Sequence, residues 1–187
     1  MNHLHLRTYI AFRLVGHRLV TAATTLPGWP DWGRALALTT AFSAVVLPLG
    51  LLGHWLTLTL APLSSLGSLK LALRVFLAPA LLEEGFWRVL LLPHKTERIS
   101  DRRRWILALL VLVLFVLMHL FSSFTVYPNG FPTFTQPLFL LSAALLGLVC
   151  TLAYWQSGSV WVSVAIHWVV VFTWLMFFGG YGQLQLT

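Results

Sequence analysis

Charged residues make up only 9% of this 187-residue chain, while hydrophobic residues make up 58%. A soluble domain carries about 25% charged residues, so this chain has too few of them to cover a surface exposed to water. A single cysteine, Cys150, excludes a scaffold held together by intramolecular disulfides. The composition therefore excludes the soluble and the disulfide-rich classes and indicates an integral membrane protein.

Acidic residues are rarer still, because five Asp and Glu stand against twelve Lys and Arg, which gives a formal net charge of +7. Most cations gather in two segments, one before the first long apolar stretch and one in the loop after the second. Cytoplasmic loops of membrane proteins carry an excess of Lys and Arg, so we expect both segments on the cytoplasmic side, next to anionic lipid. This distribution explains the charge without a nucleic-acid partner. The cations concerned are Arg7, Arg13, Arg18, Arg34, Lys95, Arg98, Arg102, Arg103 and Arg104.

Long apolar runs are abundant, and five of them meet or approach the length of about 20 residues that a helix needs to cross a bilayer. Pro48 and Pro79 lie inside the first and second runs, and each is expected to kink its helix because proline removes a helix hydrogen bond. Each crossing reverses the chain, so a cytoplasmic N-terminus places the C-terminus outside after five spans. The runs lie near residues 35–60, 69–92, 105–124, 137–154 and 159–178.

These features predict an all-α fold, a polytopic transmembrane helix bundle of about five spans with an N-terminal basic interfacial helix. Residues 1–34 are expected to form the basic interfacial segment, and residues 35–187 a single transmembrane helical domain. Arginines interrupt every apolar run near the start of the chain, so we do not expect a signal peptide there. We find no internal repeat and no second domain in the sequence.

The second apolar run contains three ionisable residues, Glu83, Glu84 and Arg88, although a charge at the centre of a span costs about 2.5 to 3.5 kcal/mol. Glu84 and Arg88 are four residues apart on one side of a helix, so we predict an internal ion pair. Glu83 points about 100° away, toward a different neighbour. Two adjacent carboxylates repel each other in a low dielectric, so one of the two could act as a general base. The structural alternative is a salt-bridged cluster that only fixes helix packing.

Two histidines lie inside other apolar runs, His119 in the third and His167 in the fifth. At about 1.5 Å per residue from the cytoplasmic ends, Glu84 lies about 15 Å deep, His119 about 21 Å and His167 about 13 Å. Three helices thus bring a carboxylate and two imidazoles to a similar level, which favours a shared function. By contrast, we expect Cys150 to be an apolar packing residue and His94 to be solvated in its loop.

A carboxylate and imidazoles inside a bilayer indicate hydrolysis, and the composition separates the known routes. The His-Glu-x-x-His pattern of a zinc protease is absent. An aspartate dyad fails because Asp31 and Asp101 both lie outside the apolar runs. Ser157-Gly158-Ser159 is the nearest serine candidate, but it lies at the end of a span and lacks the context of a nucleophile elbow. A mechanism based on glutamate remains.

The polar residues of these spans resemble those of a known family. Glu-Glu-x-x-x-Arg at residues 83–88, Phe-x-x-x-His at 115–119 and the late-span His167, after Gly-Ser-Val-Trp at 158–161, occur in the order typical of the CPBP family. This family comprises glutamate-type intramembrane proteases related to the CAAX prenyl protease Rce1 and to bacterial Abi immunity proteins. The similarity covers a four-helix, catalytic-like core at about residues 69–178. It implies an intramembrane endopeptidase that hydrolyses a peptide bond in or near the membrane.

The resemblance also implies a role for each matched residue. Glu83, together with His119, would activate a water molecule against a peptide carbonyl, and His167 would stabilise the oxyanion. The reaction would need no metal ion, and the substrate would be a peptide or a membrane protein. The residues expected to support and orient the site are Glu84, Arg88 and Phe115.

One position departs from the family pattern, because Val171 stands where the family usually has Asn or Asp, four residues after His167. Valine can neither donate to an oxyanion nor orient the imidazole, and the nearby polar side chains are those of Trp168 and Thr173. This favours an alternative, a non-catalytic membrane immunity or scaffold protein that retains the protease fold. Proton transport through the polar residues is a third possibility. A zinc site is the alternative to the metal-independent mechanism, with the ligands Glu83, Glu84, His119 and His167.

Overall fold

The computed structural model describes the backbone of residues 3–184 and the side chains of residues 13–184. Arg7, one of the cations in the predicted basic segment, lies outside the described side chains. Within the described range the regular elements are helices, and they include π-helical and 3-10 turns labelled η. In chain order they are α1 His3–Thr24, α2 Trp29–Leu52, α3 Ser65–Val75, η1 Phe76–Leu81, α4 Leu82–Glu84, η2 Gly85–Leu90, α5 Asp101–Thr125, η3 Pro128–Gly130, α6 Phe131–Phe134, α7 Pro137–Ser157, α8 Val160–Phe177 and α9 Gly180–Gln183.

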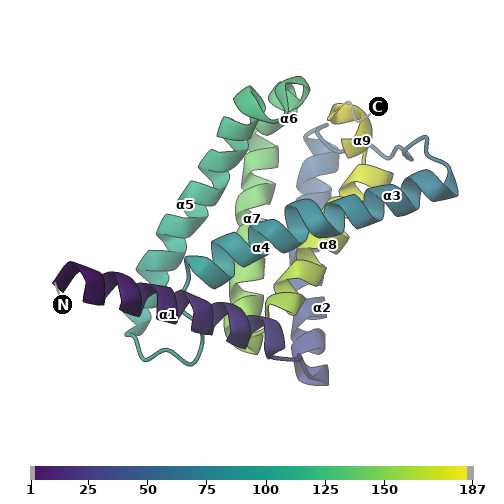
Figure 1. Cartoon of the computed structure of the whole chain (residues 1–187). Helices are drawn as coiled ribbons and strands as arrows, with labels where there is room; N and C mark the ends of the chain where they lie inside the picture. The colour runs from purple at the N-terminus through teal and green to yellow at the C-terminus, as the bar shows by residue number, and fades with distance from the viewer. Residues whose placement is uncertain (1–2, 185–187) are drawn as a thin grey trace.

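Five helical stretches are long and apolar enough to cross a membrane, which confirms the predicted all-α polytopic bundle. α7 and α8 form its centre, because α7 packs against α2, α5 and α8, while α8 also packs against α2 and α3. The stretch from α3 to η2 runs obliquely across α7 and α8 (Figure 1). The five spans are Trp29–Leu52, Ser65–Leu90, Asp101–Thr125, Pro137–Ser157 and Val160–Phe177.

The first span is shifted from its predicted position, because α2 runs Trp29–Leu52 and not 35–60. Its start follows from the extended backbone of Gly28, whose N–H donates to the Asp31 carboxylate at 2.9 Å. Its end precedes His54, which adopts a left-handed backbone conformation with φ 58° that an α-helix does not accommodate. The predicted limits of this span were therefore wrong at both ends.

The apolar residues that follow α2 cover one end of the bundle and do not lengthen the span. The Thr59 N–H donates to the carbonyl of Phe177 at 3.1 Å. The Ala61 N–H donates to the carbonyl of Met176 at 2.8 Å. These bonds satisfy carbonyls that the last turn of α8 leaves without a helical partner. Hydropathy alone does not distinguish such an irregular segment from a continued helix. The hydropathy of the sequence therefore places the end of the first span too far along the chain.

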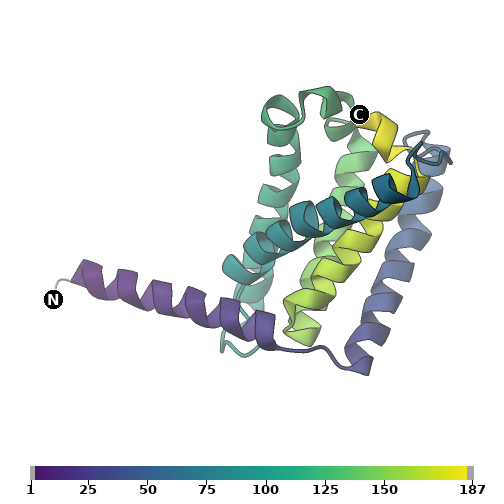
Figure 2. The same cartoon turned by 45° about the vertical axis from the view of Figure 1, so that its right-hand side comes forward.

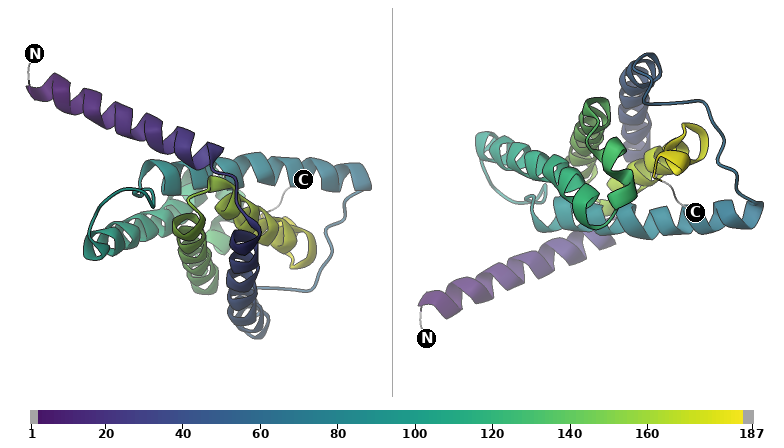
Figure 3. Two further views of the ribbon diagram at one scale, coloured as in Figure 1. Left: turned by 90° about the horizontal axis from the view of Figure 1, so that it is seen from below. Right: turned by 90° about the horizontal axis from the view of Figure 1, so that it is seen from above.

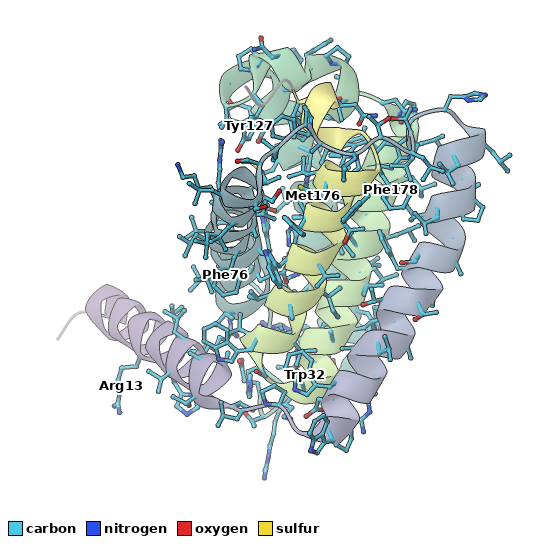
Figure 4. The ribbon with its side chains drawn as sticks, turned by 90° about the vertical axis from the view of Figure 1, so that its right-hand side faces the viewer. Arg13, Trp32, Phe76, Tyr127, Met176 and Phe178 are labelled. Atoms are coloured by element: carbon cyan, nitrogen blue, oxygen red, sulfur yellow. The ribbon has the colours of Figure 1, made fainter. Side chains whose placement is uncertain are left out.

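The two ends of the bundle differ in charge. α1, the loop between η2 and α5 and the turn between α7 and α8 lie at one end, and α6 and α9 lie at the other (Figure 1). Figure 4 shows Arg13 and Trp32 at the first end and Tyr127 and Phe178 near the second. Both segments in which the sequence concentrates its cations are at the first end, which we call the basic end.

α1 lies across the basic end, and its N-terminal part projects beyond the bundle (Figures 2 and 3). Its C-terminal part is held by Arg18, which donates to the Glu97 carboxylate at 2.6 and 2.7 Å and to the Leu90 carbonyl at 3.2 Å. The indole of Trp161 adds a bond to the Ala23 carbonyl at 2.8 Å. α1 is therefore fixed both to the end of η2 and to the start of α8.

His94 is buried, which corrects the prediction that it is solvated. Its side chain is 2% exposed, and Nε2 lies 2.9 Å from the Gly158 carbonyl oxygen. Lys95 donates to the Ser157 carbonyl beside it. Gly158 has φ 71°, and a Cβ there would come within 2.5 Å of the Lys95 side chain, so the turn requires glycine. The partner of His94 lies 64 residues away, where no local sequence signal could reveal it.

The ion pair between Arg18 of α1 and Glu97, in the loop between η2 and α5, is expected to weaken in acid. Burial raises the pKa of Glu97, but hydrogen bonds from Arg18 and the His94 N–H, with the Arg18 charge, outweigh it and hold this pKa below its ordinary value. The Glu97 carboxylate has a lower pKa in the folded protein than in the unfolded chain, where the pKa is about 4.3. The ionised carboxylate therefore stabilises the folded state at a pH above about 4.3, and this stabilisation is lost as the pH falls through the pKa of the folded state. We expect the wild type to exceed Glu97→Gln in unfolding temperature at neutral pH, and the difference to vanish in acid. An unchanged difference at low pH would contradict this.

Candidate active site

The span from α3 to η2 is broken in its middle, as Pro79 predicts. Ala78 has non-helical backbone angles, φ −143° and ψ 112°, because a residue before proline is disfavoured in the α-helical region. π-helical turns lie at the break and directly after Glu84, and such turns are frequent at functional sites. A kink was also expected at Pro48, but this proline lies within the helix α2, which continues without interruption from Trp29 to Leu52. The break precedes Glu83 and Glu84 by one turn and sets their positions.

The predicted ion pair inside the second span is present. Arg88 Nε lies 3.2 Å from Glu84 Oε2, and both side chains are almost completely buried. Arg88 Nη2 also donates to the Gly147 carbonyl of α7 at 3.0 Å. A Cβ at Gly147 would lie 2.7 Å from Leu112 Cδ1, so glycine allows the helices to approach closely here. The ion pair thus ties the second span to the fourth.

Glu84 also orients His167 on α8. His167 Nδ1 lies 2.7 Å from Glu84 Oε1, and the imidazole is 3% exposed. Because a carboxylate paired with Arg88 only accepts hydrogen bonds, Nδ1 carries the hydrogen. Nε2 is then the ring nitrogen that His167 can present to a substrate. Glu84 is therefore a positioning residue for an imidazole on another helix.

A cavity of about 1070 Å³ lies between the five spans, and Glu83, His119 and His167 all line it. His119 Nδ1 lies 2.9 Å from the Phe115 carbonyl, so this nitrogen carries the hydrogen and Nε2 is available. The Glu83 carboxylate interacts electrostatically with His119. The three residues predicted to be catalytic come from three spans and meet in one space. A carboxylate and an imidazole there have the chemistry needed to hold and deprotonate a water molecule.

Phe115 is the packing centre of this site. Its ring is 2% exposed and lies with its centroid 4.8 Å from that of His119 and 6.5 Å from that of His167. The Arg88 guanidinium lies 4.8 Å from the same centroid, within the range of a cation–π interaction. One aromatic ring thus contacts both imidazoles and the buried cation, which accounts for a phenylalanine four residues before His119.

The cavity opens to the side of the bundle between α4 and α5. Leu82 and Phe86 line it from one helix and are 67% and 48% exposed. Leu117 and Phe121 line it from α5 and are 51% and 59% exposed. Apolar side chains that both line a cavity and face outward from a membrane-spanning bundle form an opening to lipid. The rim of the cavity is therefore apolar on this side of the bundle.

Cys150 is a neighbour of the site that the sequence did not reveal. It is fully buried, and the ligand atoms of Glu84, Cys150 and His167 lie within 4.8 Å of one another. Among the described residues this is the one group of three His, Cys, Asp or Glu side chains near enough to share a metal ion, and it includes neither Glu83 nor His119. The positive charge of Arg88 beside Glu84 opposes a cation there. The thiol was missed because its partners lie on other helices.

Of the remaining residues considered in the sequence, Trp168 and Ser157 make structural hydrogen bonds, whereas Val171 and Thr173 line the cavity. Trp168 Nε1 donates to a carbonyl of α3 at 2.9 Å, which commits the indole to helix packing. The Ser157 hydroxyl donates to a carbonyl of its own helix at 2.7 Å and so secures the end of α7. Val171 and Thr173 both line the cavity, and Thr173 alone of these two offers a hydroxyl group. Thr173 is therefore the hydroxyl-bearing side chain of α8 that lines the cavity together with His167.

These features define the class of the protein, an integral membrane helix bundle with a buried carboxylate and imidazole site in a cavity that opens to lipid. The family described as Type II CAAX prenyl endopeptidase Rce1-like matches residues 65–173, more than half of the chain. The chain belongs to this family, which is a family of proteases, and it has the fold of a CAAX-type intramembrane protease. No curated protein and no solved structure matches it significantly.

Proposed function

We propose that this protein is an intramembrane endopeptidase that hydrolyses a peptide bond of a peptide or membrane-protein substrate in or near the membrane. One observation carries the proposal: Glu83, His119 and His167 come from three different spans and line the same cavity. Residues brought together from distant parts of a chain, at a cost in desolvation, indicate a function beyond helix packing. Membership of a protease family supports the same reaction class.

The mechanism that fits this geometry is attack by an activated water molecule. Glu83, with His119, accepts a proton from the water while its oxygen attacks the peptide carbonyl, and the proton then passes to the leaving amine. His167 stabilises the oxyanion from Nε2, which requires that its ring carry a hydrogen on both nitrogens. The Glu84 carboxylate beside Nδ1 stabilises that imidazolium charge. Glu84 and Arg88, which do not line the cavity, and Phe115, which does, support and orient the site.

The proposed reaction needs no metal ion. The chemistry rests on a carboxylate base and two imidazoles, and the Arg88 guanidinium occupies the charge-compensating position beside Glu84. Treatment of the reconstituted protein with EDTA is therefore expected to leave cleavage unchanged. Loss of cleavage with EDTA and its recovery with zinc would replace this mechanism by a metal-dependent one.

We propose that the basic end faces the cytoplasm. The N-terminus would then be cytoplasmic and the C-terminus outside, since five spans separate them. α1 would lie at the membrane surface with anionic lipid as its partner, because it projects from the bundle at this end and its segment is rich in arginine (Figure 2). The cationic excess then serves orientation and lipid contact and requires no nucleic acid.

One observation favours a second function, that of a non-catalytic immunity or scaffold protein. Val171 lines the cavity four residues after His167 and gives the oxyanion no donor. Turnover would then depend on His167, with Thr173 as the hydroxyl of α8 that lines the cavity. A protein that keeps the fold but not the turnover would tolerate this valine without penalty.

The double variant Glu83→Gln/His119→Ala separates the two functions. We expect it to abolish cleavage of membrane peptides, because both groups that would activate the water molecule are lost. The measurement is comparative membrane peptidomics of cells that carry the wild type or the double variant, followed by cleavage of the peptides found, with both proteins in lipid nanodiscs. Ser142→Ala is the matched control, because Ser142 also lines the cavity but donates to its own helix at 2.7 Å.

The opposite result would support the scaffold. If the double variant restores a deletion phenotype fully, and its peptide profile equals that of the wild type, the endopeptidase proposal is wrong. If the variant fails in both tests while Ser142→Ala succeeds, the scaffold alternative is wrong.

A further inference from the structure

α1 lies outside the part of the chain that matches the family, residues 65–173, yet it contacts two of the helices that carry the site. It packs against η2, which follows Glu84 in the second span, and against α8, which carries His167. Among the side chains of α1 that the structure describes, residues 13–24, Ala22 alone is buried. α1 therefore adds little to the hydrophobic core, and its polar contacts with η2 and α8 indicate a different role.

The first contact joins α1 to η2. Arg18 Nη1 donates to the Leu90 carbonyl at 3.2 Å, in the last turn of a helix, where carbonyls lack a helical partner. The positive guanidinium also suits the negative end of the helix dipole. Its Nε and Nη2 donate to the Glu97 carboxylate at 2.6 and 2.7 Å, which fixes its orientation. Because the Arg18 side chain is only 14% exposed, this contact is largely shielded from water.

The second contact joins α1 to α8. The Trp161 indole N–H donates to the Ala23 carbonyl at 2.8 Å, in the last turn of α1. Ala23 follows Arg18 by five residues, so one short segment of α1 contacts both helices. It does so at the basic end, where the C-terminal part of α1 lies against the bundle (Figure 2). We call these bonds of Arg18 and Trp161 the α1 clamp.

The α1 clamp lies near the hydrogen bond that orients His167. Leu90 follows Glu84 by six residues, and Trp161 precedes His167 by six. Both intervals are helical without a break, and six residues cover at most about 9 Å along a helix. The bond of 2.7 Å between Glu84 Oε1 and His167 Nδ1 joins the same two helices. A displacement of η2 against α8 therefore moves the partners of this bond apart.

We infer that Arg18 and Trp161 are positioning residues, which clamp η2 to α8 through α1 and thereby keep Glu84 in hydrogen-bonding contact with His167. The inference rests on the proposed endopeptidase function and adds residues that hold its site in register from a distance. Neither Arg18 nor Trp161 lines the cavity, so neither contacts a substrate there. Loss of the α1 clamp is therefore expected to slow the reaction and to leave substrate binding unchanged.

The test uses the double variant Arg18→Met/Trp161→Phe, which removes the bonds of the α1 clamp but keeps much of the bulk of both side chains. We expect kcat in nanodiscs to fall by about 100-fold with KM unchanged, because a displacement of about 1 Å at a site can cost that much. Trp161→Phe alone loses only the indole N–H and is expected to show a smaller loss. Arg18→Lys keeps a cation that can donate to the Leu90 carbonyl, so it is expected to retain more activity than Arg18→Met.

Trp29→Phe/Arg102→Met is the matched control, because it makes the same two substitutions in residues that are exposed at the basic end. It is expected to keep the kcat of the wild type. Thermal unfolding of each preparation reports whether the fold is intact. If the double variant does not fold, Trp161→Phe is compared with Trp29→Phe by the same criteria.

A second measurement follows the hydrogen bond directly and needs no turnover. In protein with isotope-labelled histidine, the Nδ1 proton of His167 gives the magnetic resonance signal that His167→Ala lacks. In the wild type the bond to Glu84 protects this proton from exchange with water. We expect the signal to be lost in Arg18→Met/Trp161→Phe and to be kept in the control.

The outcomes separate this inference from the endopeptidase proposal. A lower kcat together with loss of the His167 signal supports the α1 clamp. A lower kcat with an unchanged signal would give Arg18 and Trp161 a merely structural role, and the inference would be wrong. Wild-type kcat and signal in the double variant would likewise refute the α1 clamp and leave the endopeptidase intact. Loss of the signal in the variant of a protein that cleaves nothing would refute the endopeptidase and retain the α1 clamp.

Discussion

Glu83→Gln is expected to lower kcat by about 10²- to 10⁴-fold, the range that a positioned general base contributes. Glutamine has nearly the same size but cannot accept the proton of the attacking water. Glu83 lines the cavity, and among the described residues no hydrogen bond or ion pair engages its carboxylate. Its neutralisation removes the electrostatic interaction with His119 but breaks no hydrogen bond or ion pair, so the free energy of unfolding is expected to change little. The measurement is single-turnover cleavage in nanodiscs, with thermal unfolding of the same preparation.

Glu84→Gln, one residue further on, provides the contrast. Its carboxylate pairs with Arg88 at 3.2 Å and accepts from His167 at 2.7 Å. Its neutralisation leaves a buried guanidinium without its counter-charge and weakens the orientation of the imidazole. We therefore expect this variant to lose both activity and stability, whereas Glu83→Gln loses activity alone. Wild-type kcat in Glu83→Gln, or equal loss of stability in both variants, would contradict the assignment of the base.

The sequence predicts those features whose causes are local. Five apolar runs specify five spans because hydropathy acts over the length of one helix. The Glu84 and Arg88 pair follows from a spacing of four residues in one helix, and the break at Pro79 follows from the chemistry of proline. The order of the polar residues along the spans was sufficient to identify the family, since each short motif lies in a separate helix.

Features that depend on packing between helices could not be predicted in this way. The sequence places His94 in a charged loop and Cys150 in an apolar run, but their surroundings come from segments far away along the chain. The link between Glu84 and His167 joins residues 83 positions apart. Likewise, the first span ends early because the following residues bond to the end of α8, a tertiary contact that hydropathy does not contain. Local patterns therefore supplied the candidates, and the tertiary structure supplied their partners.

Arg88→Met is expected to destabilise the protein by about 3–5 kcal/mol, the cost of leaving one charge of a buried pair uncompensated. The guanidinium is 2% exposed, and it pairs with Glu84, donates to the Gly147 carbonyl and lies over the Phe115 ring. Methionine fills much of the same volume but replaces none of the polar contacts. The measurement is the free energy of unfolding from a titration with SDS in mixed micelles. Arg102→Met is the control, because Arg102 is exposed at the basic end and its replacement is expected to cost less than about 0.5 kcal/mol.

The double variant Glu84→Met/Arg88→Met distinguishes lost charge compensation from lost packing. Removal of both partners of a buried pair is often neutral, because the desolvation cost disappears together with the attraction. We therefore expect the double variant to regain most of the stability that Arg88→Met loses. It should nevertheless remain inactive, because His167 no longer has the carboxylate that fixes its Nδ1. Equal destabilisation of the single and the double variant would instead assign the effect to packing around Phe115. Recovery of stability without recovery of activity would show that the buried pair is retained for the orientation of the imidazole, since apolar residues can replace it in the fold.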